Sequence, residues 1–304
     1  MKPISFVIIT YNRPRDLLAL VQNIATLNRA EELLQDIVIV NNDSDVSYAD
    51  VQAFIKAHPE LPFRFLESAE NLGVARGRNF AVSKSNGTYL IMLDDDAEMG
   101  NTDCLEILLD EFQRPSGDRE TAILSFRVEY FENRQLQANA FPHKDLEGHR
   151  DLERFDTYYF AGGAHAIRRD VYNRLGGYPV DFFYGMEEYD LSYRLIETGY
   201  SIRYTNRILM LHKESPLGRA TKKDKQAMLW INKSKVAWRY LPKPYFFTTA
   251  LLWSVEYLRK TNVDIIGWLR NWPSVFRISR VEKRTPIGTA ALAYLRQVRA
   301  RLWY

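Results

Sequence analysis

Short apolar runs alternate with helical patterns along the first two thirds of the 304-residue chain. Short apolar runs are typical of buried strands, whereas apolar side chains that recur every three or four positions indicate helices. The predicted strands are 6–10, 36–40, 63–66, 89–93, 121–131, 161–168, 202–204 and 208–211, and the predicted helices lie within 14–27, 51–55, 73–82, 170–175 and 187–198. This alternation predicts an α/β fold with right-handed crossovers, a mostly parallel central sheet and flanking helices.

Two segments depart from this alternation. Residues 132–156 are polar and irregular, and because structureless connections of that length are uncommon, we expect a functional loop that covers the site as a lid. From about Asp224 the chain becomes helical, aromatic and basic. Residues 213–304 hold 19 Lys and Arg against 5 Asp and Glu, together with all six tryptophans, whereas residues 1–212 hold 22 against 33. Such an asymmetry indicates an attachment surface for an anionic partner.

The overall composition is that of an ordinary globular protein, with 46% hydrophobic and 26% charged residues. The single cysteine, Cys104, excludes an internal disulfide and most cysteine-based metal sites, and it fits a reducing cytosol. The start of the chain passes directly into a strand-like run without a small-residue cleavage site, so we expect no signal peptide and a cytoplasmic location. No stretch approaches the roughly 18 consecutive apolar residues of a membrane-spanning helix.

Three consecutive aspartates, Asp94, Asp95 and Asp96, follow the predicted strand 89–93. The carboxyl edge of an open α/β sheet is where such folds bind ligands. Adjacent carboxylates repel one another, and a hard divalent cation that also contacts substrate phosphates would neutralise them. The alternative is a polar turn between strand and helix in which an aspartate caps the helix.

Several segments, in this order, resemble the inverting family 2 glycosyltransferases, which have the GT-A fold. The matching segments are residues 7–13, 40–44, 71–79, 93–96, 162–163, 176–178 and 187–194. A series of matches in the right order is more specific than any single motif. The resemblance implies a GT-A, Rossmann-like catalytic domain at 1–215, with a nucleotide-sugar half at about 1–100 and an acceptor half at about 101–215. Residues 216–304 would form a separate, mainly helical, basic and aromatic C-terminal region.

The resemblance also implies a metal site, in which Asp96 ligates Mn²⁺ or Mg²⁺ and Asp94 lies near the ribose and the metal. Asp95, the middle residue, is expected beside the nucleotide. His212 ends the predicted strand 208–211, where the family often has a histidine that touches the metal or the diphosphate. Neutral imidazole is a common metal ligand, and a purely structural hydrogen bond is the alternative.

The donor nucleotide is expected to contact the loops that follow the first two strands. The resemblance gives the base and ribose contacts as Thr10, Tyr11, Arg13 and Asp43. Asp43 would accept from the ring N–H of uracil or thymine, and the alternative is an Asx-turn. Arg76 and Arg78 are expected near the diphosphate because Arg suits bidentate phosphate contacts. The alternative is that only one of them contacts the diphosphate and the other is a surface charge.

An inverting transfer needs one general base that takes the proton from the acceptor hydroxyl. The candidates are Glu187, Glu188 and Asp190. The family's usual motif, Glu-Asp-x-Asp-Leu, has the base in second position, which is Glu188 here and is one methylene longer. Asp190 is the second choice, and Glu187 is expected to support the loop. The alternative is that these carboxylates only stabilise the N-terminus of a helix.

Together these features predict a metal-dependent inverting hexosyltransferase that uses a nucleoside-diphosphate sugar, with UDP favoured over TDP or GDP. The acceptor would be a glycan or lipid-linked glycan of bacterial surface-polysaccharide assembly. The first alternative is a non-catalytic, membrane-associated scaffold with a GT-A fold. The second is a sugar nucleotidyltransferase, which would need a glycine-rich phosphate loop where this chain has residues 10–14.

The basic C-terminal region is predicted to lie on the anionic inner face of the membrane, since basic residues interleaved with tryptophan and tyrosine suit interfacial helices. Packing on the catalytic domain and a homodimer interface are the alternatives. No recognised nucleic-acid-binding module accompanies the positive charge, so a nucleic-acid partner is not expected.

Overall fold

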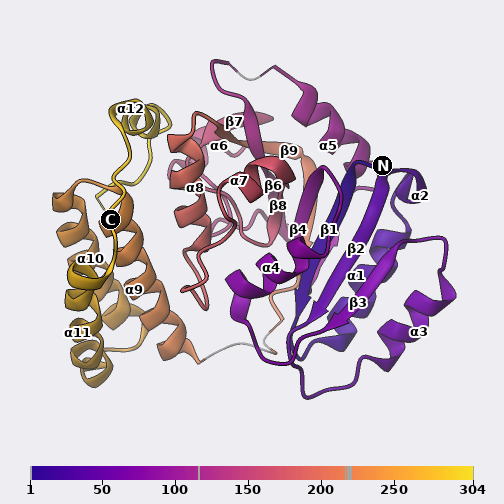
Figure 1. Cartoon of the computed structure of the whole chain (residues 1–304), viewed down its shortest axis with the longest axis horizontal. Helices are drawn as coiled ribbons and strands as arrows, with labels where there is room; N and C mark the ends of the chain where they lie inside the picture. The colour runs from indigo at the N-terminus through magenta and orange to yellow at the C-terminus, as the bar shows by residue number, and fades with distance from the viewer. Residues whose placement is uncertain (1, 116, 216, 218–220, 304) are drawn as a thin grey trace.

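Among the described residues, nine strands form one sheet in the order β3-β2-β1-β4-β8-β6-β9-β5, with β7 paired to β9 at the side. Figure 1 shows β4, β1, β2 and β3 side by side. The computed structural model describes residues 2–115, 117–215, 217 and 221–303. The strands are β1 (Ile4–Thr10), β2 (Leu34–Asn41), β3 (Phe63–Glu67), β4 (Tyr89–Asp94), β5 (Ala97–Met99), β6 (Thr121–Tyr130), β7 (Arg154–Thr157), β8 (Ala164–Arg168) and β9 (Ser201–His212). Strands β1 to β4 are parallel, as are β6 and β9, which confirms the predicted mostly parallel α/β sheet.

Helices cover both faces of the sheet, and its apolar side chains divide between two cores. The helices of the catalytic part, residues 1–215, are α1 (Pro14–Ala25), α2 (Ala30–Leu33), α3 (Ala49–Ala57), α4 (Gly73–Ser83), α5 (Cys104–Gln113), α6 (Leu146–His149), α7 (Arg169–Arg174) and α8 (Glu187–Glu197). Alternate strand residues point to opposite faces, so Val7 joins one core while Phe6 and Ile8 join the other. Both faces of the central strands are therefore buried.

The structure corrects two predictions. The segments 202–204 and 208–211 belong to one strand, β9. Thr205 still pairs with Phe126 of β6, and Leu209 pairs with the next residue, Arg127, so residues 206–208 form an irregularity inside one continuous strand. The segment 132–156 is not wholly irregular: it contains α6 and β7, and Arg154 of β7 pairs with Thr205 of β9. Helix α5 and strand β5 were not predicted.

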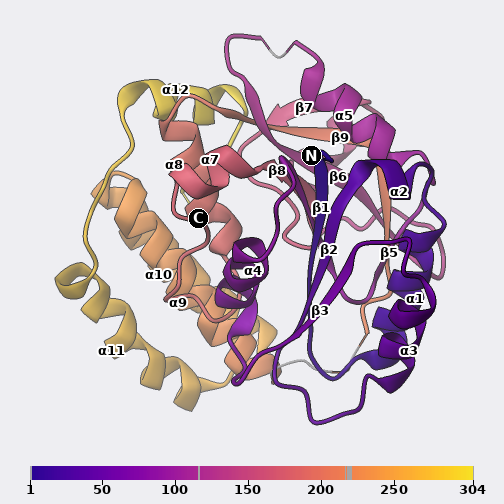
Figure 2. The ribbon, with the colours of Figure 1, turned by 45° about the vertical axis from the view of Figure 1, so that its right-hand side comes forward.

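The C-terminal region consists of α9 (Lys222–Tyr240), α10 (Lys243–Lys260), α11 (Ile265–Val281) and α12 (Thr289–Gln297). Its inner side continues the core beneath α4 and α8, with Trp230 fully buried and its indole N–H donating to the carbonyl of Ala250 at 2.9 Å. Figure 2 shows α11 at the outer edge of this layer. The predicted boundary at 215/216 adjoins residues 216 and 218–220, which lie outside the described residues. Within the described part of the chain, no helix is both long and apolar enough to span a bilayer.

One buried cation in this layer contacts the catalytic part. Lys233 of α9 is only 5% exposed, and its ammonium lies 3.2 Å from the centre of the Tyr189 ring on α8. Burial, reinforced by the positive charge of Arg301, lowers the pKa of Lys233 to about 7. The cation–π contact with Tyr189 offsets only part of the loss of hydration.

We expect the variant Lys233→Met to be more stable than the wild type at pH 7, by a few degrees in Tm. An unfolded lysine keeps its proton up to roughly pH 10.4, whereas folded Lys233 loses it near pH 7, so wild-type stability rises with pH across that window. The advantage of the variant should therefore shrink between pH 7 and pH 9 in thermal melts. Lys222→Met, at an exposed position on the same helix, is the control. A pH-independent difference would contradict the assignment.

Candidate active site

The carboxyl ends of β1, β2 and β4 meet at one edge of the sheet, beside a cavity of about 680 Å³. This is the edge at which open α/β sheets bind ligands. The cavity is lined by Thr10, by Asp94, by the start of α8 and by Lys225 and Leu229 of α9. The C-terminal region therefore forms part of the wall of this cleft.

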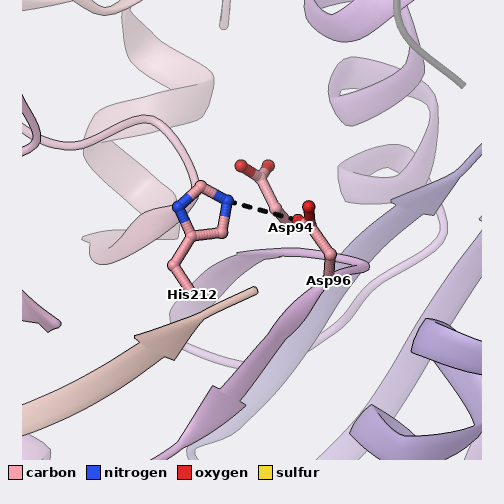
Figure 3. A group of neighbouring side chains, drawn as sticks. All are labelled: Asp94, Asp96 and His212. Atoms are coloured by element: carbon pink, nitrogen blue, oxygen red, sulfur yellow. Dashed lines mark ion pairs between the residues drawn. The ribbon is translucent and has the colours of Figure 1, made fainter. Parts of the chain in front are cut away.

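Asp94, Asp96 and His212 converge inside the cleft (Figure 3). Asp94 ends β4 and Asp96 lies two residues further on, while His212 ends β9, whose antiparallel pairing with β5 places Ala97 opposite the histidine. One ligand atom from each residue lies within 4.8 Å of the others, and His212 Nε2 is 3.4 Å from a carboxylate oxygen of Asp96. Two carboxylates and an imidazole can together hold a divalent cation. The structure thus brings together the three residues predicted as metal ligands.

Gln137 orients the histidine. Its amide nitrogen donates to Glu214 at 2.7 Å, and its amide oxygen lies 2.9 Å from His212 Nδ1. A carboxylate only accepts, so the amide oxygen must face the ring and accept the Nδ1 proton. Nε2 is then directed towards the aspartates, which is the arrangement that fixes metal-binding histidines. Sequence reasoning missed Gln137, because nothing in the spacing of the polar segment 132–156 singles it out.

Asp95 lines the same cleft and contacts the loop after β1. Its carboxylate accepts from Thr10 Oγ1 and from the Arg13 guanidinium, both at 2.7 Å, and burial raises the pKa of Asp95 to about 6. Arg13 also lies 3.3 Å from Asp96 and donates to the carbonyl of Ser215 at 3.2 Å. Asp95 and Arg13 therefore fasten the first loop to the metal-ligand strand.

The remaining predicted donor contacts separate into two groups. Thr10, Tyr11 and Arg13 line the cleft. Asp43 is exposed, has a left-handed backbone with φ of 63°, and does not line it. Arg76 is likewise exposed and forms an ion pair with Glu70.

Arg78, by contrast, is buried in the wall of the cleft. It donates to Asp94 at 2.8 Å, and its other terminal nitrogen lies 3.7 Å from Glu187, which is also buried. Burial of the Glu187 carboxylate raises its pKa, and the Arg78 charge opposes that rise. Arg78 therefore links the metal-binding aspartate to the first turn of α8.

Gly162 and Gly163 separate the aspartates from Glu188. A Cβ atom on Gly163 would collide with the Asp94 carboxylate, and one on Gly162 would collide with Glu188. Only glycine lets both carboxylates approach the backbone so closely. Burial, followed by repulsion from Glu187, raises the pKa of Glu188 to about 8, a range that suits a proton acceptor.

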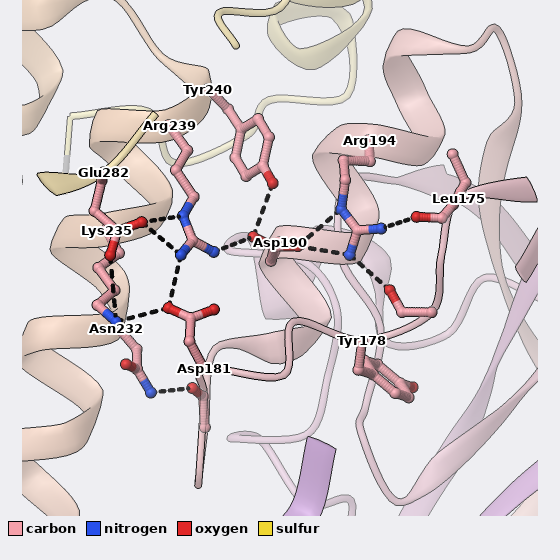
Figure 4. A network of polar contacts seen from close by, with 12 residues as sticks. Leu175, Tyr178, Asp181, Asp190, Arg194, Asn232, Lys235, Arg239, Tyr240 and Glu282 are labelled. Atoms are coloured by element: carbon pink, nitrogen blue, oxygen red, sulfur yellow. Dashed lines mark hydrogen bonds and ion pairs between the residues drawn. The ribbon is translucent and has the colours of Figure 1, made fainter. Parts of the chain in front are cut away.

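Asp190 lies on the other side of α8 and does not line the cleft (Figure 4). Its carboxylate accepts from Arg194 at 2.8 Å, from Arg239 of α9 at 3.0 Å and from the Tyr240 hydroxyl at 2.8 Å. Residues two apart on a helix do not share a face, so the spacing already separates Asp190 from Glu188. The structure thus brings Glu187 and Glu188 into the cleft and places Asp190 between α8 and the C-terminal region.

Helix α9 also holds the loop that leads into α8. The Asn232 side-chain amide donates to the carbonyls of Tyr184 and Gly185, at 3.1 and 3.0 Å, and Lys235 pairs with Asp181 at 2.7 Å. The loop ends at Met186, whose backbone is left-handed with φ of 72°. Sequence reasoning missed Asn232, because its partners are carbonyls that tertiary packing alone brings near.

Comparison with known proteins agrees with this geometry. A family model described as glycosyl transferase family 2 matches residues 5–176. A Haemophilus influenzae protein of uncharacterised function is 28% identical over 179 residues, which cover 58% of this chain and 92% of that protein. An uncharacterised glycosyltransferase of Bacillus subtilis, YwdF, is 27% identical over 179 residues, covering 59% of this chain and 62% of that protein.

Solved glycosyltransferases share the fold. A mannosyltransferase from Pyrobaculum calidifontis, in complex with GDP-Man and Mn²⁺, superposes with a TM-score of 0.59 and 17% identity over 98% of this chain and 79% of its own. Residues 1–349 of S. aureus TarS, in complex with UDP-GlcNAc, give a TM-score of 0.62 and 14% identity over 92% of this chain and 82% of theirs. These likenesses establish the GT-A fold with an added helical C-terminal region. With the family model covering more than half of its length, the chain belongs to glycosyltransferase family 2.

Proposed function

We propose that this protein is a metal-dependent inverting glycosyltransferase that moves a sugar from a nucleoside-diphosphate donor to a hydroxyl group of a glycan or lipid-linked glycan. One observation carries the proposal. The group formed by Asp94, Asp96 and His212 shares a cavity with Glu188. Between them lie two glycines, which have no side chains to fill the space. A single displacement requires metal ligands and a proton acceptor on opposite sides of a space that the donor sugar can occupy.

Asp94, Asp96 and His212 would hold Mn²⁺ or Mg²⁺, and the partly buried hydrogen bond from His212 to Gln137 supports that assignment. The bound ion supplies positive charge that stabilises the departing diphosphate. Thr10, Tyr11 and Arg13, fastened by Asp95, would contact the base and ribose, with Asp43 on the adjoining loop. Of the two predicted arginines, Arg78 is the one beside Asp94. UDP remains our first choice of nucleotide, ahead of TDP and GDP.

Glu188 would take the proton from the acceptor hydroxyl as that oxygen attacks the anomeric carbon of the donor sugar. Its raised pKa fits this work, because a base with a pKa near the working pH binds the proton effectively. Glu187 and Arg78 would hold the first turn of α8 in place. We assign Asp190 a positioning role, since its oxygens already accept from two arginines and a tyrosine. The setting we propose is the cytoplasmic face of the membrane, with the protein attached peripherally.

Replacing Glu188 by Gln should lower the rate of transfer by about 10²- to 10⁴-fold, because the isosteric amide cannot take a proton. The rise in Tm on adding nucleotide and metal should persist, since the donor side is unchanged. Glu197→Gln, at an exposed position near the end of the same helix, is the matched control and should retain activity. Full transfer activity in Glu188→Gln would remove Glu188 from the role of base.

A thermal-shift panel of UDP, TDP, GDP and CMP, each with and without Mn²⁺ or Mg²⁺, tests the metal site. A ligand that binds only the folded protein raises its stability by mass action. We expect a metal-dependent rise with one diphosphate, abolished in Asp96→Ala. Gln137→Leu should weaken the metal response by about 10- to 100-fold, because His212 loses its orienting partner, whereas exposed Gln135→Leu should not. A folded sample with no response to any nucleotide would favour a non-catalytic scaffold.

Asn232→Ala and Arg239→Met should each lower kcat about tenfold or more while leaving the nucleotide-and-metal thermal shift unchanged. Both side chains hold α8 or the loop before it, so their loss displaces Glu188 without touching the donor side. Lys222→Met is the control, because Lys222 lies at an exposed position on the same helix. A change in donor affinity with unaltered kcat would contradict this positioning role.

A further inference from the structure

Exposed large apolar side chains are concentrated in the C-terminal region. Of the 16 such residues in the described chain, 11 lie between Phe247 and Trp303. The outer sides of α10 and α11 and the turn between them carry most of them. Surface apolar residues that occur singly need no explanation, whereas a continuous group marks an interaction site.

Helix α10 has a buried and an exposed apolar face. Its inner face, with Phe246, Ala250 and Tyr257, packs into the core. On the outer face, Phe247 and Leu251 are four residues apart and are 64% and 58% exposed. Val255, one turn further on, is 56% exposed and continues the stripe, and Arg259 follows it by another turn.

Helix α11 repeats the arrangement. Val275 and Ile278 are buried on its inner side. Ile266, Leu269 and Phe276 are 73%, 59% and 66% exposed on the other side. Their spacing of three and seven residues places them on a common face. This apolar face, together with that of α10, is called the outer face below; it comprises Phe247, Leu251, Val255, Ile266, Leu269 and Phe276.

Positive charge surrounds the outer face. Between Lys243 and Lys283 there are seven Lys and Arg and three Asp and Glu. The three acidic side chains are already engaged: Glu256 pairs with Arg259, Asp264 accepts from Tyr257, and Glu282 pairs with Arg239. The exposed guanidiniums of Arg270, Arg277 and Arg280 on α11 take part in no ion pair within the described residues.

We propose that the outer face binds the surface of an anionic lipid bilayer. Its apolar side chains would enter the boundary between headgroups and acyl chains, and Arg270, Arg277 and Arg280 would contact lipid phosphates. A two-fold dimer would instead bring the same patch of each copy together, and with it the same arginines. The uncompensated positive charge of that patch therefore favours an anionic surface over a second copy.

The placement also suits a lipid-linked acceptor, a point that rests on the proposed function. Helix α9 packs against both α10 and α11, and Leu229 and Lys225 on the same helix line the cleft. Packed helices lie about 8–10 Å apart, so a single layer separates the outer face from the wall of the cleft. An acceptor sugar carried by a lipid would therefore begin close to Glu188.

Flotation of the full chain with vesicles tests the proposal without any activity measurement. Vesicles of phosphatidylcholine alone are compared with vesicles that also contain one quarter phosphatidylglycerol. We expect binding to the anionic vesicles to exceed binding to the neutral ones by at least about tenfold, and to weaken as NaCl is raised. Equal binding to both kinds of vesicle, or to neither, would overturn the proposal.

Two variants locate the contact. Ile266→Ser with Leu269→Ser removes apolar contact, and Arg270→Glu with Arg277→Glu reverses charge; each pair should reduce binding to anionic vesicles by at least about tenfold. Leu152→Ser, at an exposed apolar position far along the chain from the outer face, is the matched control. Binding unchanged by both pairs would place the membrane contact elsewhere.

Light scattering and the nucleotide thermal shift separate the remaining outcomes. A dimer that the Ile266→Ser and Leu269→Ser pair converts to a monomer would assign the outer face to a second copy and overturn the membrane proposal. Vesicle binding without any nucleotide response would leave the membrane face in place and count against the transferase. A nucleotide response without vesicle binding would do the reverse.

Discussion

Repulsion among carboxylates is the constraint around which the cleft is organised. Asp94, Asp95 and Asp96 meet Glu187 and Glu188 within one cavity, and burial makes their mutual repulsion stronger than it would be in water. Two arginines, the partly buried Arg13 and the buried Arg78, lie between members of this group. Each arginine joins separate elements. The ion pairs that offset this repulsion therefore also fix the first loop, β4 and α8 relative to one another. The remaining negative charge would favour the binding of the proposed cation.

The C-terminal region is tied to this centre through α8. Asp190 accepts from Arg239 of α9, and Asn232 holds the loop before α8, so the C-terminal region fixes the helix that carries the proposed proton acceptor. Buried ion pairs are weak sources of stability but are costly to break by removing one partner. Their contribution here is therefore better understood as fixing geometry than as strengthening the fold. The C-terminal helices complete the cleft rather than merely following it.

Much of this architecture could be predicted from sequence, for identifiable reasons. Strands β1, β2 and β4 are buried on both faces, so they appear as continuous apolar runs, and the carboxylates after β4 follow from that assignment. Strand β5 has only three residues and left no periodic signal. Helix α5 carries Leu105 and Leu108 at helical spacing, so the sequence contains the signal for this helix although it was not predicted.

The residues of the site could be predicted where strand topology alone brings them together. Asp94, Asp96 and His212 lie at strand ends, where topology places them together, whereas Gln137 and Asn232 act through contacts that only tertiary packing creates. The direction of Asp190 was available from helical geometry, because two residues along a helix turn a side chain to the far side. Motif resemblance alone groups it with Glu188 and conceals that difference.

The three proposed metal ligands come from distant parts of the chain, and Asp94 and His212 are 118 positions apart. During synthesis, the nucleotide half leaves the ribosome first and carries only the carboxylates. The imidazole arrives after nearly all of the catalytic part has been made, and it reaches the aspartates only when β9 pairs with β5 and β6. Complete coordination therefore marks the end of assembly, and a nascent or truncated chain lacks the nitrogen ligand that would retain an ion.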